Sequence, residues 1–393
     1  MDYFYGRLRK TARVRAILPG RGGAAMQAGR EKPTILHIML RDKHTSGYIS
    51  FLKLMLPEYT HVFAIRDRGF DPAQVFELQL PDHDHVHLVP SYTDVFKDPD
   101  LRKAARAADK IVFSGVWYAA PFMRRLLLHP LLLRKTWIQF WGGDYYRYKS
   151  APTSRTARQD RRILFLAFRR CAGLVFLTPG EYEQFHQITG IENRHMVAPV
   201  PRKAGRKLPE PSELERPHAV PRLLVGNSAN PSSNHLRVLE LLHTAYPDEV
   251  FDVVCPLSYG GTPAYVEEVT ALGKAYFHEH FIPLLSFMEP EQYSSLLAGC
   301  DLGIFDFERQ QGLSNIGELM RLGKKVYLNP ASPLCHSLAD MGAVLFSLKE
   351  IGSVSFREFL AISDADRQHN REACDPVKRD AEKARQWRAL LKA

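Results

Sequence analysis

Short apolar runs alternate with amphipathic stretches along the first half of the chain. The runs that resemble strands cover residues 34–39, 60–65, 110–114, 136–140 and 173–177, and residues 46–56 show helical spacing. A continuous apolar run is typical of a strand buried on both faces of a parallel sheet, whose strands need crossover connections that are usually helical. The first half therefore predicts an open α/β sheet covered by helices.

The same pattern begins again after a proline-rich stretch. Residues 199–221 hold six prolines among charged residues, which is typical of a linker between domains. Strands are then predicted over 222–225, 250–256, 302–305 and 325–328, and helices over 233–246, 264–276 and 316–322. We expect two Rossmann-like domains, at residues 31–205 and 222–350, joined by a linker at 206–221. Ligands of open α/β sheets bind at the carboxyl ends of the strands, which here line a cleft.

The two ends of the chain differ from these domains. Residues 1–30 mix arginine with glycine and alanine, and predict a basic, flexible extension. Residues 375–391 form a charged amphipathic pattern that predicts a helix. We expect the segment 351–393 to form helices that pack back on the N-terminal domain.

Composition excludes several classes of protein. The 393 residues are 45% hydrophobic and 24% charged, as is typical of a globular protein. No apolar run approaches the roughly 20 residues that span a bilayer, and no signal-peptide core is present, so we expect a cytoplasmic location.

The five cysteines form no CxxC pair, and the alternating His83, His85 and His87 have no companion ligands. Neither a disulfide framework nor a metal site is predicted.

Charge is divided unevenly between the two halves. Residues 1–205 hold 33 Lys and Arg against 18 Asp and Glu, a balance of +15. The remaining residues hold 20 against 25, a balance of −5 within the total of +10. A basic half favours contact with a polyanion or an anionic membrane, although a merely basic soluble domain has the same composition.

Two polar clusters follow predicted strands of the second domain. Gly226, Asn227 and Ser228 come directly after a strand, and Asn234 lies where the next helix opens, with Ser232 or Ser233 as the expected N-cap. Backbone amides at such a turn can hold a phosphate, although an ordinary βα turn looks the same. The second cluster is Arg309, Gln310, Gln311 and Gly312, before a helix expected to start near Ser314 or Asn315 with Glu318 in its first turn. An arginine, two amides and a helix N-terminus there suit a diphosphate and a sugar.

A third cluster follows the strand 136–140 of the first domain. Trp141, Gly142, Gly143 and Asp144 combine an aromatic ring, two glycines and a carboxylate. This combination suits stacking on a carbohydrate and a general base for an acceptor hydroxyl. Asp144 as a simple capping residue is the alternative interpretation.

These clusters together resemble one known family. The segments 140–145, 224–228 with 233–235, 256–259 with 264–269, and 300–303 with 309–312 resemble the TDP-N-acetylfucosamine:lipid II N-acetylfucosaminyltransferases of enterobacterial common antigen assembly, which are of the 4-alpha-L-fucosyltransferase type. The resemblance runs in order through residues 135–350. It implies a GT-B fold, with a nucleotide-sugar donor in the C-terminal domain and a lipid-linked saccharide acceptor mostly in the N-terminal domain. It implies no metal and no other cofactor.

The resemblance also implies roles for individual residues. Asp144 becomes the expected catalytic base, and Gly142 and Gly143 on the same loop are expected to bind substrate. The residues expected to bind the donor are Gly226, Asn227, Ser228, Asn234, Tyr259, Arg309, Gln310, Gln311, Gly312 and Asn315. Glu318 is expected to hold the ribose, by analogy with a spaced acidic pair in other GT-B enzymes. The chain departs from the family pattern at residues 1–30, at 40–100, and at Asn315 and Glu318.

Two stretches of the basic half suit a membrane surface. Residues 124–135 are a leucine patch between cations, and residues 155–170 hold six arginines around an apolar centre. Such segments can bury apolar side chains while arginines face anionic headgroups, although core helices with solvated flanks have the same composition. We therefore expect peripheral binding to the cytoplasmic face of the inner membrane.

Two other classes of function are less well supported. A non-catalytic binder of nucleotide-sugars or of nucleic acid fits the basic half, but no aromatic-basic interleaving or helix-turn-helix supports nucleic acid, which we do not expect as a partner. A sugar-nucleotide epimerase fits the α/β content, but the chain lacks a glycine-rich dinucleotide loop. A glycosyltransferase acting on a different glycan or on a protein stays an open alternative.

Overall fold

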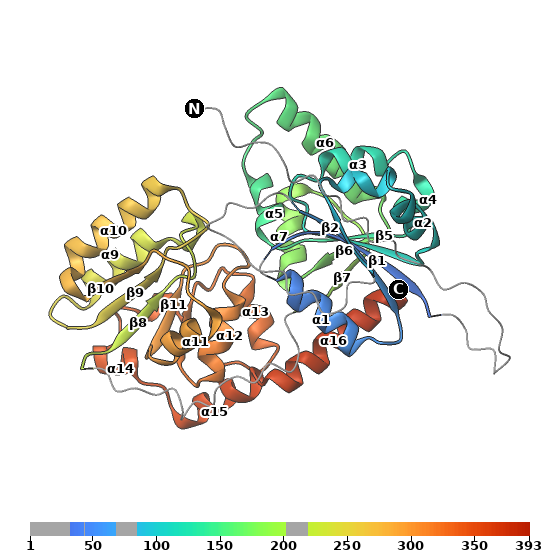
Figure 1. Cartoon of the computed structure of the whole chain (residues 1–393). Coiled ribbons are helices and arrows are strands. Elements are labelled where there is room, and N and C mark those ends of the chain that lie inside the picture. The colour runs from blue at the N-terminus through green and yellow to red at the C-terminus, as the bar shows by residue number, and fades with distance from the viewer. Residues whose placement is uncertain (1–31, 43, 68–84, 202–218) are drawn as a thin grey trace, which may run out of the picture.

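The structure is a computed structural model that describes residues 32–42, 44–67, 85–201 and 219–393 (Figure 1). The predicted extension at 1–30 and residues 206–218 of the predicted linker lie outside the described residues, as does His83. Among the described residues, no helix combines the length and the apolar composition that crossing a membrane requires.

The N-terminal half folds around a seven-stranded parallel sheet with the order β3-β2-β1-β4-β5-β6-β7. Its strands are β1 (Thr34–Leu40), β2 (Thr60–Arg66), β3 (Val86–Val89), β4 (Lys110–Ser114), β5 (Thr136–Gln139), β6 (Gly173–Phe176) and β7 (His195–Val197). The helices between them are α1 (Thr45–Met55), α2 (Pro99–Ala107), α3 (Ala120–Leu126), α4 (Pro130–Leu133), α5 (Gly143–Tyr146), α6 (Arg155–Arg170) and α7 (Pro179–Thr189).

The C-terminal half builds a six-stranded parallel sheet with the order β10-β9-β8-β11-β12-β13. Its strands are β8 (Arg222–Val225), β9 (Asp252–Pro256), β10 (Phe281–Leu284), β11 (Leu302–Phe305), β12 (Lys325–Leu328) and β13 (Phe346–Ser347). Its helices are α9 (His235–Ala245), α10 (Pro263–Phe277), α11 (Pro290–Ala298), α12 (Leu313–Arg321), α13 (Leu334–Ala339), α14 (Phe356–Leu360), α15 (Asp364–Ala373) and α16 (Pro376–Lys392).

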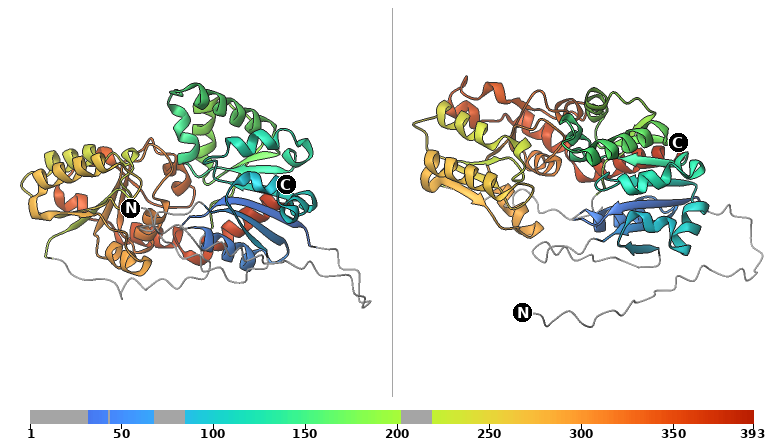
Figure 2. Two further views of the ribbon diagram at one scale, coloured as in Figure 1. Left: turned by 45° about the horizontal axis from the view of Figure 1, so that its top comes forward. Right: turned by 90° about the horizontal axis from the view of Figure 1, so that it is seen from above.

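Each sheet is covered by helices on both faces (Figure 2). One face of the first sheet packs on α2, α3, α6 and α7, and the other packs on α1 and α16. The second sheet lies between α9, α10 and α14 on one face and α11, α12 and α13 on the other. Apolar residues buried on both faces of the central strands explain why those strands are continuous apolar runs in the sequence.

Helix α16 crosses from the second half and completes the core of the first (Figure 1). The ring of Trp387 is fully buried and meets Tyr48 edge-on at 5.4 Å, and its Nε1 donates to the carbonyl of Pro199 at 2.9 Å. Lys110 donates to the carbonyl of Leu390 at 2.5 Å, and Arg388 to the carboxylate of Glu58 at 2.7 Å.

The predicted α/β class with two Rossmann-like sheets is confirmed, and most predicted strands match within one or two residues. The edge strands β3, β7, β10 and β13 were not predicted, because they are short and only partly buried. Helix α12 begins at Leu313, earlier than expected, so Glu318 lies beyond its first turn. The expected caps Ser232 and Ser233 lie in a 3-10 turn that Asn230 caps instead.

Candidate functional site

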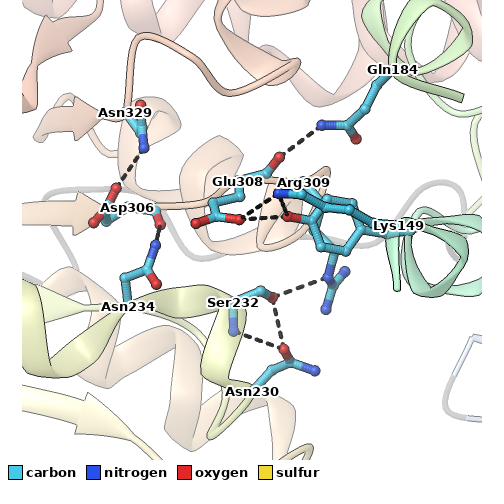
Figure 3. A network of polar contacts seen from close by, with 10 residues as sticks. Lys149, Gln184, Asn230, Ser232, Asn234, Asp306, Glu308, Arg309 and Asn329 are labelled. Carbon is cyan, nitrogen blue, oxygen red and sulfur yellow. Dashed lines mark hydrogen bonds and ion pairs between the residues drawn. The ribbon is translucent and has the colours of Figure 1, made fainter. Parts of the chain in front are cut away.

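Loops at the carboxyl ends of the two sheets meet at a seam between the halves of the molecule (Figure 3). The loop 306–312, which follows β11, faces helix α5 and helix α7 of the first half. Glu308 accepts a hydrogen bond from the hydroxyl of Tyr146 at 2.5 Å and lies 3.4 Å from the ammonium of Lys149. The amide of Gln184 donates to the carbonyl of Glu308 at 2.8 Å. The seam is therefore polar and ordered by side chains of both halves.

Gly142 lets the two loops approach closely. A Cβ atom at this position would lie 2.7 Å from the carbonyl oxygen of Gln310 and 3.0 Å from its side-chain oxygen. The residue also has a φ of +81°, which side chains rarely tolerate. The glycine predicted for this site is thus required by backbone conformation and by space.

Arg309 connects the 306–312 loop to the turn after β8. Its Nε donates to the hydroxyl of Ser232 at 3.1 Å, and that hydroxyl contacts the side-chain oxygen of Gln311 at 3.0 Å. The amide nitrogen of Gln311 donates to Ser233 at 3.1 Å. The two predicted donor-side clusters are therefore joined by side-chain hydrogen bonds.

The guanidinium of Arg309 also reaches the first half. Its Nη1 lies 3.4 Å from the position of a Cβ on Gly143, and it donates to the carbonyl of Gln310 at 3.1 Å. Burial lowers the pKa of Arg309, while the nearby Tyr145 and Asp144 favour its charged form. A half-buried cation at a seam, next to glycine backbone, suits a phosphate group.

Asp306 anchors the start of the same loop. Its backbone carbonyl accepts from the amide of Asn234 at 2.9 Å, and its buried carboxylate accepts from Asn329 at 2.7 Å and pairs with Arg237. Asn234 adopts a left-handed conformation with a φ of +51°. The loop is thus held at its base by residues of the βα turn, so Arg309 and Gln311 project from a fixed frame.

Asp144 is completely buried, and both of its oxygens are occupied. Oδ1 accepts from the backbone amide of Trp141 at 2.8 Å, and Oδ2 accepts from that of Val116 at 3.0 Å. Burial raises the pKa of Asp144 to about 6, despite these hydrogen bonds. In this arrangement Asp144 ties two loops together, and its carboxylate is fully shielded from solvent. The geometry therefore favours the capping interpretation over the catalytic base.

Glu181, which the sequence analysis did not select, has an open oxygen. It lies in the first turn of α7, where its Oε2 accepts from the backbone amides of Leu177 and Thr178 at 2.9 Å. Its Oε1 is buried without a partner in the described part of the chain, and lies 3.3 Å from the position of a Cβ on Gly142. Burial raises the pKa of Glu181 to about 8.

The turn after β8 holds two more buried polar atoms. Asn227 Oδ1 and His235 Nε2 have no hydrogen-bond partner among the described residues. His235 Nδ1 lies 3.2 Å from the hydroxyl of Tyr265, and burial lowers the pKa of His235 to about 4. A Cβ on Gly226 would lie 2.5 Å from Nε2, so a glycine is needed for the ring to pack there. The predicted residue Ser228 is buried beside this turn and accepts from Ser233 through its carbonyl at 3.3 Å.

The remaining predicted residues lie outside the network around Arg309. Gly312 is the N-cap of α12 in a left-handed conformation, and Asn315 donates to the hydroxyl of Tyr293 at 2.6 Å. Tyr259 lies in the loop after β9, where its carbonyl accepts from Ala229 at 2.8 Å. Both oxygens of Glu318 accept hydrogen bonds from Arg321, at 2.8 and 3.2 Å. The role of Glu318 as a ribose ligand stays a prediction.

Sequence reasoning missed the residues that bridge the seam. Tyr146, Gln184 and Glu308 are separated by 38 to 162 residues along the chain, and no local pattern links them. Glu181 carries a local signal, because Thr178 and Glu181 form a capping box that the sequence displays. The capping box predicts where the helix begins, but it does not reveal that Oε1 of Glu181 lacks a partner.

Solved structures with the same architecture include a glycosyltransferase and a sugar-phosphate synthase. A glycosyltransferase from Rickettsia africae matches with a TM-score of 0.60 at 13% identity, over 92% of this chain and 98% of that chain. A sucrose-phosphate synthase from Thermosynechococcus elongatus matches with a TM-score of 0.60 at 12% identity, over 91% and 96%. An E. coli structure, described as trehalose-6-phosphate bound with UDP-2-fluoro glucose, matches with a TM-score of 0.59 at 11% identity, over 92% and 99%. These likenesses show the GT-B fold.

The family is shown by the sequence itself. Residues 96–369 match the family model of the 4-alpha-L-fucosyltransferases, glycosyl transferase group 56. This range runs from the end of the turn before α2 to α15, and includes all three polar clusters. The match confirms the family resemblance found in the sequence. The chain belongs to the 4-alpha-L-fucosyltransferase family, glycosyl transferase group 56, and is a hexosyltransferase with a GT-B fold.

Proposed function

We propose that the enzyme transfers a deoxyamino sugar, such as N-acetylfucosamine, from a dTDP- or UDP-sugar to a saccharide linked to polyprenyl diphosphate. The transfer would serve the assembly of a bacterial surface polysaccharide. We assign donor binding to the C-terminal half, from residue 222, and acceptor binding to the N-terminal half, up to residue 205. The family membership and the seam between the halves support this assignment.

The observation that carries the proposal is the network of Arg309, Ser232 and Gln311. It joins the βα turn after β8 to the N-terminal end of α12, directly beside Gly143 of the first half. A diphosphate there would meet a guanidinium and the free amides of a helix N-terminus, which together offset the charge of a departing nucleotide. Asn227 and His235 add buried polar atoms on the same turn that lack partners within the described residues.

The proton of the acceptor hydroxyl needs a base, and the first half brings two carboxylates, Asp144 and Glu181, close to Arg309. Asp144 has both oxygens occupied by backbone amides, whereas Glu181 keeps one oxygen open beside Gly142. We therefore assign Asp144 to positioning the 141–144 loop and Glu181 to the base. Burial raises the pKa of Glu181 to about 8, so its deprotonated form takes up a proton more readily than an ordinary carboxylate does.

The acceptor end of the reaction suggests contact with a membrane. Leu128 and Leu131 are 77% and 79% exposed, next to the exposed Arg124, Arg125 and Arg134. Helix α6, which carries six arginines, packs against α3 in the same region (Figure 1). Exposed leucines among cations suit the interface of an anionic bilayer, so we propose peripheral binding to the cytoplasmic face of the inner membrane through this surface.

A panel of nucleotides tests the donor site. Purified protein is heated with dTDP, UDP, GDP and their sugars, and we expect one diphosphate series to raise the unfolding temperature. Arg309→Gln should abolish this shift, whereas Arg321→Gln, on the same half but paired with Glu318, should not. If no nucleotide diphosphate changes the unfolding temperature of the natural protein, the proposed transfer is wrong.

Vesicle flotation tests the membrane surface. The protein should float with vesicles that contain phosphatidylglycerol and stay behind with neutral ones, because arginines near the surface contribute about 1 kcal/mol each. Leu128→Glu with Leu131→Glu should abolish flotation, and Val377→Glu, an equally exposed apolar residue on α16, should leave it unchanged. Equal flotation of both variants would refute this surface.

A further inference from the structure

The first sheet has its own binding position at the carboxyl ends of its strands. In the order β3-β2-β1-β4-β5, the chain leaves β1 toward one edge of the sheet and leaves β4 toward the other. Open α/β sheets bind ligands at such a switch point, in the crevice outside the carboxyl ends of the strands. The residues that end the neighbouring strands there include Arg66 at the end of β2 and Tyr118 in the loop after β4.

Arg66 is a buried cation without an anionic partner. Only 8% of the residue is exposed, no carboxylate of the described residues pairs with its guanidinium, and Nε has no hydrogen-bond partner there. The guanidinium carbon lies 5.1 Å from the ring centre of Tyr92 and 5.1 Å from that of Tyr118. Tyrosine rings hold a guanidinium in place, but they do not neutralise its charge. Burying a charge without a counter-ion is costly, so an anion from outside the chain is the natural complement.

The described carboxylates of this region form no ion pair with Arg66, and Oδ1 of Asp67 is buried without a hydrogen-bond partner among the described residues. Asp67 pairs with Arg41 at 3.0 Å, and Asp144 accepts from two backbone amides, as described above. Asp42 accepts from the backbone amide of His44 at 2.8 Å. Among the described residues, no acid therefore forms an ion pair with Arg66.

The surroundings of Arg66 suit a carbohydrate. Tyr118 is 57% exposed and has a φ of +57°, a conformation that costs a residue with a side chain about 1 kcal/mol or more. This strained residue places its ring over the guanidinium. At the same edge of the sheet, ring carbons of Trp141 lie 3.8 Å from the position that a Cβ on Gly115 would occupy. The Nε1 of Trp141 is a buried donor without a partner among the described residues. Exposed aromatic rings beside free donors are common features of sugar sites.

We propose that Arg66, held between Tyr92 and Tyr118, binds an oxyanion of the acceptor saccharide, which is either a phosphate or a carboxylate. The identification of the ligand as an acceptor saccharide rests on the proposed function. The oxyanion site itself is inferred from Arg66 and its surroundings. A planar guanidinium binds both kinds of oxyanion through two parallel hydrogen bonds. Arg66 would thereby position the acceptor on the first half, across the seam from Arg309.

The test measures binding of inorganic pyrophosphate, glucuronate and neutral methyl glucoside by calorimetry and tryptophan fluorescence. It is done in an Arg309→Gln background, so that the donor site does not contribute. Arg66→Met keeps the aliphatic stem and removes the charge, and Arg102→Met removes an exposed arginine of α2 as the matched control. Two charge-assisted hydrogen bonds correspond to a loss of affinity of about a hundredfold to ten-thousandfold, and competition from water reduces this toward tenfold.

We expect pyrophosphate, glucuronate or both to bind, Arg66→Met to weaken that binding at least about tenfold, and Arg102→Met to leave it unchanged. Pyrophosphate alone would identify a phosphate ligand, and glucuronate alone a carboxylate on a sugar. Arg66→Met should also unfold at the same temperature as the parent or higher, because an unpaired buried charge is removed; a purely structural arginine would instead lower it. The inference is overturned if neither anion binds or if Arg66→Met binds both as tightly as the parent. Because no nucleotide is used, this result is independent of the donor panel.

Discussion

Replacing Glu181 by glutamine should stabilise the protein at alkaline pH. The change is nearly isosteric, and the amide oxygen can accept from Leu177 and Thr178 as Oε2 does now. The amide nitrogen then takes the place of the unpartnered Oε1. Oε1 and two oxygens of Gln310 all lie close to the position that a Cβ on Gly142 would occupy. A neutral donor facing acceptors replaces a buried charge without a partner.

The magnitude follows from the pKa of Glu181, which burial raises from 4.5 to about 8. A carboxyl group with a raised pKa in the folded state binds its proton more tightly there than in the unfolded chain. Its contribution to stability is therefore complete below about pH 4.5 and is lost as the pH rises through about 8. A difference of three to four pKa units corresponds to roughly 4–5 kcal/mol, the upper limit of what the substitution can recover.

Urea denaturation at pH 5, 7 and 9 measures the effect. We expect the natural protein and Glu181→Gln to be close at pH 5 and to separate progressively toward pH 9, with the variant more stable. Glu183→Gln changes an exposed carboxylate on the same helix and should follow the natural protein at every pH. Parallel curves for Glu181→Gln across the whole range would refute the buried, uncompensated carboxylate. Loss of transfer activity in the stabilised variant would support Glu181 as the base.

Three further substitutions probe other parts of the structure. Asp144→Ala leaves two buried backbone amides without acceptors, and should cost about 2–6 kcal/mol of stability and remove the hydrogen-exchange protection of the Trp141 amide. Gly142→Ala imposes a strained φ of +81° and drives a methyl group against the Gln310 carbonyl, so the thermal shift produced by the donor nucleotide should shrink; an unchanged shift would mean that the seam is not part of the donor site. Trp387→Ala empties a core position under the first sheet and should cost about 3–5 kcal/mol, measured by urea denaturation against exposed Val377→Ala.

The fold was largely predictable because its central strands are buried on both faces. Strands β4, β8, β11 and β12 were predicted to the residue, since an apolar run in a parallel sheet begins and ends where burial does. The edge strands β7 and β10 carry polar or half-buried residues, so their sequences resemble loops. Helix α12 begins before its first polar residues because Gly312 adopts a left-handed cap, which the pattern of side chains does not reveal.

The candidate site was predictable only in part, for a similar reason. Arg309 and Gln311 belong to a run of polar residues that directly follows a strand. Such a run predicts a ligand site at the carboxyl end of that strand. The role of Asp144 depends on where the backbone of Val116 lies, 28 residues away in sequence, and the open oxygen of Glu181 depends on the contact between the halves. Side-chain partners across a seam come from tertiary structure, which no local pattern encodes.

The return of α16 to the first half has a consequence for how the protein is made. Trp387 donates to the carbonyl of Pro199, 188 residues earlier in the chain, and covers a face of the first sheet together with α1. At about 5–20 residues per second, a ribosome needs roughly 10–40 s to make the intervening chain. During that time one apolar face of the first sheet lacks its final cover, so the N-terminal half completes its folding only after the last helix has been synthesised. The first half is thus translated before the second half, and yet its fold is completed only after the second half has been made.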